Sequence, residues 1–116
     1  MMKRILIIDD NEDIRKIIGY DLIKAGFDVD DAQDGESGYQ MIQKEKNYDL
    51  IIVDWMMPGM SGIDLVRTLR CQHNNSLLFM LTAKDGVDDL AEAFEAGVDD
   101  YMRKPFSPRE LTIRIQ

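Results

Sequence analysis

The sequence is poor in the residues that build disulfide frameworks and membrane spans. Its single cysteine, Cys71, excludes an internal disulfide and cannot form a thiolate metal site by itself. The unbroken apolar runs reach only about five residues, whereas a membrane-spanning helix needs about 20. Asp9 and Asp10 stop the N-terminal apolar stretch too early for a secretory signal peptide. These absences argue against a membrane protein and predict a cytoplasmic one.

Basic residues are also scarce. The chain has 14 Lys and Arg against 22 Asp and Glu, with a formal net charge of -8. Direct nucleic-acid binding needs a basic face, so we expect none from this domain. The 116 residues, 45% hydrophobic and 31% charged, have the profile of a folded protein. No linker, repeat or low-complexity tract interrupts them, so residues 1–116 are predicted to form one domain.

Apolar runs and amphipathic segments alternate along the chain. Continuous apolar runs at 5–8, 50–53 and 77–81 predict strands that are buried on both faces of a sheet. The mixed segments 27–31 and 98–102 suit strands at the sheet edges. Helical spacing of apolar residues predicts helices near 14–22, 36–46, 62–69 and 87–94. Five strand–helix repeats predict an α/β fold with a parallel sheet in the order 2-1-3-4-5.

Start and stop signals support these helices. Gly26 and Gly97 are placed to end two of them. Three starts carry a capping pair, namely Ser61 with Asp64, Asp85 with Asp88, and Ser107 with Glu110. Residues 111–115 alternate like a strand, but Ser107-Pro108 is a strong start signal, so we predict a fifth helix there.

Acidic side chains, one hydroxyl and one amine follow the predicted strands. In a parallel α/β sheet, functional groups collect at the carboxyl ends of the strands, which here carry Asp9, Asp10, Asp54, Thr82 and Lys104. Strands 1 and 3 are neighbours in the predicted order, so three carboxylates share one pocket. Crowded carboxylates demand a cation, and oxygen ligands suit Mg²⁺. With the amine and hydroxyl opposite, the set indicates phosphoryl transfer to a carboxylate.

Each of these residues also has a simpler interpretation. Asp10 could cap the first helix, and Asp54 could serve the turn before Pro58. Thr82 could be an ordinary strand-end hydroxyl and Lys104 a surface lysine. Their conjunction at one sheet edge favours a shared site.

Short motifs lie in order along the chain, namely IIDD at 7–10, DLIIVD at 49–54, MPGMSG at 57–62, LTA at 81–83, GVDDY at 97–101 and KPF at 104–106. Through these motifs the chain resembles the receiver domain of two-component response regulators over essentially its whole length. The resemblance implies a CheY-like, flavodoxin-like doubly wound fold with five strands and five helices. It also implies a cis bond between Lys104 and Pro105.

The resemblance implies a role for each matched residue. Asp54 would accept phosphate from a phosphohistidine of a sensor histidine kinase. The Mg²⁺ ligands would be Asp10, Asp54 and the backbone carbonyl of Met56, while Asp9 would act mostly through water. Lys104 would contact the phosphate and Thr82 would swing toward it. Tyr101 would then rotate inward and change the face made by the fourth helix, fifth strand and fifth helix.

The segment KPFSPREL at 104–111 looks like receivers of OmpR/PhoB-type transcription factors. This implies an N-terminal receiver in a longer regulator that controls transcription; a free-standing receiver is the alternative. Such receivers pair through the face just described, and Asp100, Glu110 and Arg114 match its charges. Leu90 stands where a basic residue is usual, so we expect a homodimer that is weak or phosphorylation-dependent.

Other classes fit less well. A haloacid-dehalogenase-type phosphatase would carry a second Asp where Met56 stands, and a flavodoxin-like cofactor binder would need a Ser/Thr-rich loop in place of DDNE at 9–12. No G-x-G-x-x-G motif is present for a dinucleotide. A pseudo-receiver without phosphorylation remains the runner-up. We therefore do not expect an enzyme, but a domain that catalyses only its own phosphorylation and dephosphorylation.

Overall fold

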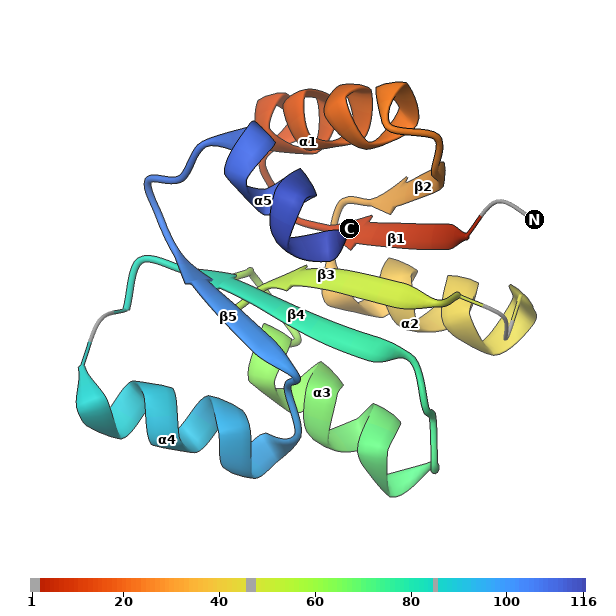
Figure 1. Cartoon of the computed structure of the whole chain (residues 1–116). Helices are drawn as coiled ribbons and strands as arrows, with labels where there is room; N and C mark the ends of the chain where they lie inside the picture. Colours follow the sequence, from red (N-terminus) through yellow and green to blue (C-terminus); the bar gives the residue numbers. More distant parts are fainter. Residues whose placement is uncertain (1–2, 46–47, 85) are drawn as a thin grey trace.

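A computed structural model describes residues 3–45, 48–84 and 86–116 (Figure 1). Strands and helices alternate strictly along this part of the chain. The elements are β1 (Arg4–Ile8), α1 (Glu12–Lys24), β2 (Asp28–Ala32), α2 (Gly35–Glu45), β3 (Leu50–Asp54), α3 (Gly62–Cys71), β4 (Leu77–Thr82), α4 (Val87–Ala96), β5 (Asp100–Arg103) and α5 (Pro108–Ile115). No helix among them is long and apolar enough to cross a membrane.

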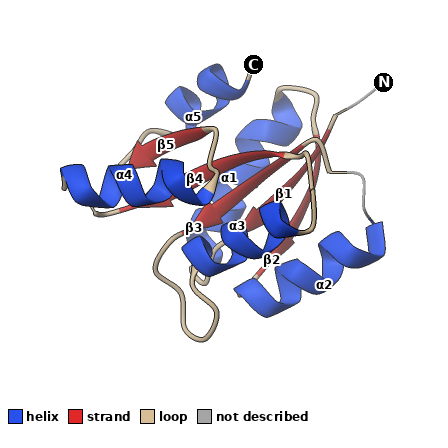
Figure 2. Ribbon diagram, turned by 90° about the horizontal axis from the view of Figure 1, so that it is seen from below, coloured by secondary structure: helices blue, strands red, loops and turns tan. Residues whose placement is uncertain are grey.

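The strands form one parallel sheet in the order β2-β1-β3-β4-β5, as the sequence predicts. Helices α1 and α5 cover one face of this sheet, and α2, α3 and α4 cover the other (Figures 1 and 2). The doubly wound fold is therefore confirmed. It brings the carboxyl ends of β1, β3 and β4 together, because these three strands are neighbours.

Each central strand contributes to two hydrophobic cores. In β1, Leu6 and Ile8 face α2 and α3, while Ile5 and Ile7 face α1 and α5. All four side chains are at most 1% exposed. This two-sided burial explains why β1, β3 and β4 read as continuous apolar runs rather than alternating ones.

Most predicted boundaries hold to within two residues. Gly26 and Gly97 follow α1 and α4 with φ of 101° and 120°, the left-handed conformation that favours glycine at a helix end. The strand β5 begins at Asp100 rather than at residue 98, because Val98 first inserts into the core beneath α3 and α4.

The ends of three helices need separate comment. The segment 108–115 is the helix α5, and the Ser107 hydroxyl accepts the Glu110 N–H at 3.4 Å, as predicted. Asp85, which the sequence predicts to pair with Asp88, lies outside the described part of the chain. Lys46, the expected last residue of the second helix, also lies outside it. Gly86 is the N-cap of α4 and supplies no side-chain bond.

Candidate functional site

Three carboxylates meet at the carboxyl edge of the sheet. Ile8 pairs with Val53 in the register of β1 and β3, so the next residues, Asp9 and Asp54, lie side by side. Oxygens of Asp9, Asp10 and Asp54 all lie within 4.8 Å of one another. Asp9 is fully buried and Asp54 is 4% exposed, whereas Asp10 faces solvent. The arrangement offers hard oxygen ligands with one open side, which suits a divalent cation.

The simpler interpretation of Asp10 as a helix cap is wrong. The side chain of Asn11 caps α1 by accepting the Ile14 N–H at 3.2 Å. Asp9 in turn accepts the Asn11 N–H at 2.9 Å, which holds the start of the loop. Because Asn11 takes the capping position, the Asp10 carboxylate is left at the acidic cluster.

Lys104 brings positive charge to this cluster from the end of β5. Its Nζ lies 3.3 Å from Asp9 Oδ2 and 3.3 Å from Asp54 Oδ1. The peptide bond between Lys104 and Pro105 is cis, as the resemblance to receiver domains implies. Burial raises the pKa of Asp54 to about 6, with a further contribution from the Asp9 charge, and the Lys104 ammonium opposes both.

Thr82 and Tyr101 meet at one backbone segment, the loop after β4. Thr82 is fully buried, and its hydroxyl accepts the Lys84 N–H at 3.0 Å. The Tyr101 hydroxyl donates to the Lys84 carbonyl. The two predicted switch residues therefore contact the same residue from β4 and β5.

The loop after β3 is shaped by close packing. A Cβ at Gly62 would lie 2.2 Å from the Asp54 carbonyl oxygen, so only glycine fits where α3 begins. The Gly62 N–H donates to the Trp55 carbonyl at 2.9 Å. Met56 lies in this loop with an exposed side chain, while Trp55 is buried.

Sequence reasoning missed one residue that supports the acidic cluster. Arg15 donates to the Asp9 backbone carbonyl at 2.7 Å and pairs with Asp31 at 2.7 Å. The sequence offers one clue to Arg15: it lies one helical turn after Asn11, in the first turn of α1, so its side chain can reach back toward the residues that precede the helix. Arg15 ties β2, α1 and the loop at Asp9 together.

Comparison with known proteins decides the family. A family model described as the response regulator receiver domain matches residues 5–116. The chain belongs to this family. As a receiver domain of a two-component response regulator, it is a signalling module and not a metabolic enzyme, which sets aside the phosphatase and cofactor-binding alternatives.

Several relatives of this receiver domain are curated or have solved structures. The chain is 44% identical to the alkaline phosphatase synthesis transcriptional regulatory protein PhoP of Bacillus subtilis (strain 168), over all of its own length and 48% of that protein. It is 40% identical to the transcriptional regulatory protein SrrA of Staphylococcus aureus (strain NCTC 8325 / PS 47), over its whole length and 47% of that protein. The chain thus spans about half the length of these relatives.

The chemotaxis protein CheY4 of Vibrio cholerae has a similar structure, with a TM-score of 0.93, 31% identity, and coverage of 100% of this chain and 98% of that one. The receiver domain of the Francisella response regulator 1452 aligns with a TM-score of 0.90 and 37% identity, covering 97% of this chain and 93% of that one.

Proposed function

We propose that Asp54 accepts a phosphoryl group from a phosphohistidine of a sensor histidine kinase. A carboxylate oxygen of Asp54 attacks phosphorus, the bond to the histidine nitrogen breaks, and an acyl phosphate forms. The observation that carries the proposal is that the buried Asp54 carboxylate lies 3.3 Å from the Lys104 ammonium, beside two further carboxylates. Water later hydrolyses the acyl phosphate, so the domain catalyses only its own modification and its reversal.

The acidic cluster fits Mg²⁺ because its oxygens lie within 4.8 Å of one another and Asp10 leaves one side open. Asp10, Asp54 and the backbone carbonyl of Met56 would hold the ion, with Asp9 acting mostly through a water molecule. When bound, Mg²⁺ would neutralise the oxygens of the incoming phosphoryl group.

Lys104 and Thr82 complete the proposed site. The Lys104 ammonium, already between Asp9 and Asp54, donates to a phosphoryl oxygen. The Thr82 hydroxyl turns from the Lys84 N–H toward the phosphoryl group and donates to it. Tyr101 then moves inward, and the face formed by α4, β5 and α5 changes its shape. That face would carry the signal to the next partner.

Intact-mass spectrometry tests the acceptor. A small acyl phosphate donor with Mg²⁺ should add one phosphoryl group, and mild base should remove it because the adduct is an acyl phosphate. Asp54→Asn should abolish the addition, while Asp88→Asn, a matched change of an exposed carboxylate in the first turn of α4, should leave it intact. Robust labelling of Asp54→Asn would overturn the assignment, and an unlabelled wild-type chain would favour a pseudo-receiver.

We also propose that the receiver is the N-terminal part of a longer cytoplasmic regulator that controls transcription. Two observations support this: the two curated relatives named above are transcriptional regulators, and the chain spans 48% and 47% of their lengths. Sequencing the complete gene tests it. A DNA-binding domain after residue 116 is expected, and a stop codon there would contradict the proposal.

A further inference from the structure

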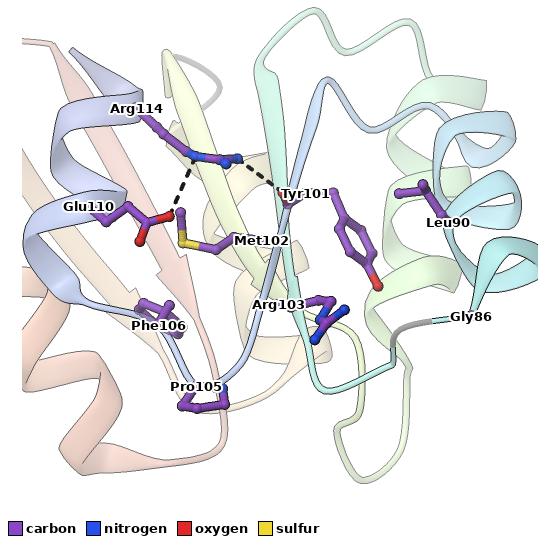
Figure 3. Close-up of a pocket in the computed structure, with 9 residues that line it drawn as sticks. All are labelled: Gly86, Leu90, Tyr101, Met102, Arg103, Pro105, Phe106, Glu110 and Arg114. Carbon is purple, nitrogen blue, oxygen red and sulfur yellow. Dashed lines mark hydrogen bonds and ion pairs between the residues drawn. The ribbon is translucent and has the colours of Figure 1, made fainter.

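Four contacts converge on Lys84, the second residue after β4. Its backbone N–H donates to the Thr82 hydroxyl at 3.0 Å, and its carbonyl accepts the Tyr101 hydroxyl. Figure 3 shows the Tyr101 ring extending toward the start of α4 at Gly86. The backbone of Lys84 thus joins the two residues that the proposed function makes mobile.

The side chain of Lys84 joins two further elements. Its ammonium lies 4.7 Å from the centroid of the Trp55 ring, a cation–π contact with the residue that directly follows Asp54. The same ammonium lies 3.7 Å from Asp89 Oδ1, in the first turn of α4. The Lys84 and Asp89 side chains are 35% and 34% exposed, so water screens this pair only in part.

The contacts of the Lys84 ammonium with Trp55 and Asp89 form a bridge, and Trp55 is its buried end. The Trp55 residue is 4% exposed, and its backbone N–H donates to the Leu81 carbonyl at 2.9 Å. Asp89, at the other end, belongs to a helix whose N-cap, Gly86, supplies no side-chain bond. The Lys84 ammonium therefore connects the residue that follows β3 to the first turn of α4.

We propose that Lys84 is a positioning residue that holds the end of β4 and the first turn of α4 in the arrangement without phosphate. This inference rests on the proposed function, in which Thr82 leaves Lys84 for the phosphoryl group. Once Thr82 turns away, the Lys84 N–H loses its acceptor, and Lys84 must move for this N–H to find another. The bridge from Trp55 to Asp89 opposes that movement, so it favours one of the two states.

The charge of Lys84 also allows a role that would favour the phosphorylated state instead. Its ammonium could leave Trp55 and act as a second cation on the phosphoryl group, in which case removing it would weaken binding of a phosphate mimic. The bridge requires the reverse, because a contact made only in the state without phosphate raises the apparent Kd of the mimic. The sign of the change therefore separates the two roles.

The experiment is a titration of beryllofluoride with Mg²⁺, followed by amide chemical shifts in NMR spectra. Lys84→Met keeps the length of the side chain and removes its charge. It should bind the mimic about three- to tenfold more tightly, given the usual strength of a cation–π contact and a partly exposed ion pair. Lys84→Arg keeps the charge and stacks on the ring, so it should stay within about twofold of the wild type. Asp89→Asn should tighten binding by less.

The outcomes are distinguishable. Unchanged or weaker binding by Lys84→Met would overturn the bridge, and weaker binding would favour the second-cation role. A merely structural role would lower the melting temperature without tightening the mimic, which would also overturn the proposal. A wild-type chain that does not bind the mimic at all would overturn the proposed function itself.

Discussion

Opposing electrostatic effects act on the Asp54 carboxylate at the edge of the sheet. Its side chain is buried next to the Asp9 carboxylate, and both effects disfavour its charge. The Lys104 ammonium, 3.3 Å away, favours the charge but does not balance them. The pKa of Asp54 therefore rises from 3.8 to about 6 in the folded state without a bound cation.

The raised pKa predicts a pH-dependent effect of Asp54→Asn on stability. As pH rises, the unfolded chain loses this proton near its ordinary pKa and the folded chain only near 6, so Asp54 lowers the free energy of unfolding between these values. Without divalent cations, Asp54→Asn should be more stable than the wild type by about 3 kcal/mol at neutral pH. The difference should shrink steadily below pH 6.

Urea denaturation at several pH values, in the presence of a chelator, measures this difference. Asp88→Asn is the control, because that carboxylate is exposed in the first turn of α4. A constant gap from pH 7.5 down to about pH 4 would show that the effect of Asp54→Asn is unrelated to ionisation.

At the scale of elements, the guanidinium of Arg70 joins α3 to the loop that precedes β4 and to the loop that precedes β5. It donates to the carbonyls of Gly97, Asn74 and Ser76, each at 2.9 Å. It also pairs with Asp99 at 2.8 Å, and the same Asp99 oxygen accepts the Leu78 N–H. No local pattern marks Arg70 in the sequence, since it reads as an ordinary basic residue in the last turn of a helix.

We expect Arg70→Met to lower the free energy of unfolding by about 2 kcal/mol, because the carbonyls lose a charged donor. Arg70→Lys should recover little, since a single ammonium cannot reach donors spread over a planar fork. Urea denaturation with an unchanged m-value would measure the loss. Arg67→Met, which removes a more exposed pair with Glu92, is the control, and an equally large loss there would count against a special role for Arg70.

At the scale of the whole molecule, Mg²⁺ should stabilise the fold. A ligand present at 100 times its Kd adds about 2.7 kcal/mol to the free energy of unfolding when it binds only the folded state. The melting temperature should rise with Mg²⁺ in the wild type and in Asp13→Ala, an exposed acid on α1, but much less in Asp10→Ala. A melting temperature that is indifferent to Mg²⁺ would count against the metal site.

The face formed by α4, β5 and α5 is the surface through which we predict two copies of the domain to pair (Figure 3). Arg114 pairs within the chain, 3.6 Å from Asp100 and 3.9 Å from Glu110. Leu90 on α4 is 39% exposed. Because it carries no positive charge, it cannot form an ion pair with Glu110 of a second copy. Exposed ion pairs contribute only about 0–1 kcal/mol, so a dimer through this face is predicted to be weak rather than impossible.

Sedimentation of the domain with and without beryllofluoride measures this association. Weak association, or association that requires the mimic, is expected. Leu90→Glu should reduce it by placing a like charge opposite Glu110, while Leu77→Glu, an exposed apolar position at the start of β4, should not. Tight dimers in both states would contradict the prediction.

The sequence by itself determined the order of elements, the order of strands and the sheet edge where the acids meet. Apolar periodicity and helix-end residues are local patterns, and parallel topology then places Asp9, Asp54 and Thr82 at neighbouring strand ends. What the site residues do in phosphorylation stays a prediction. Only the tertiary structure decided that Asn11 rather than Asp10 caps α1, and that Lys84 reaches Trp55. The physical reason is that such contacts depend on side-chain directions and on distances between segments far apart in the chain, which residue spacing does not encode.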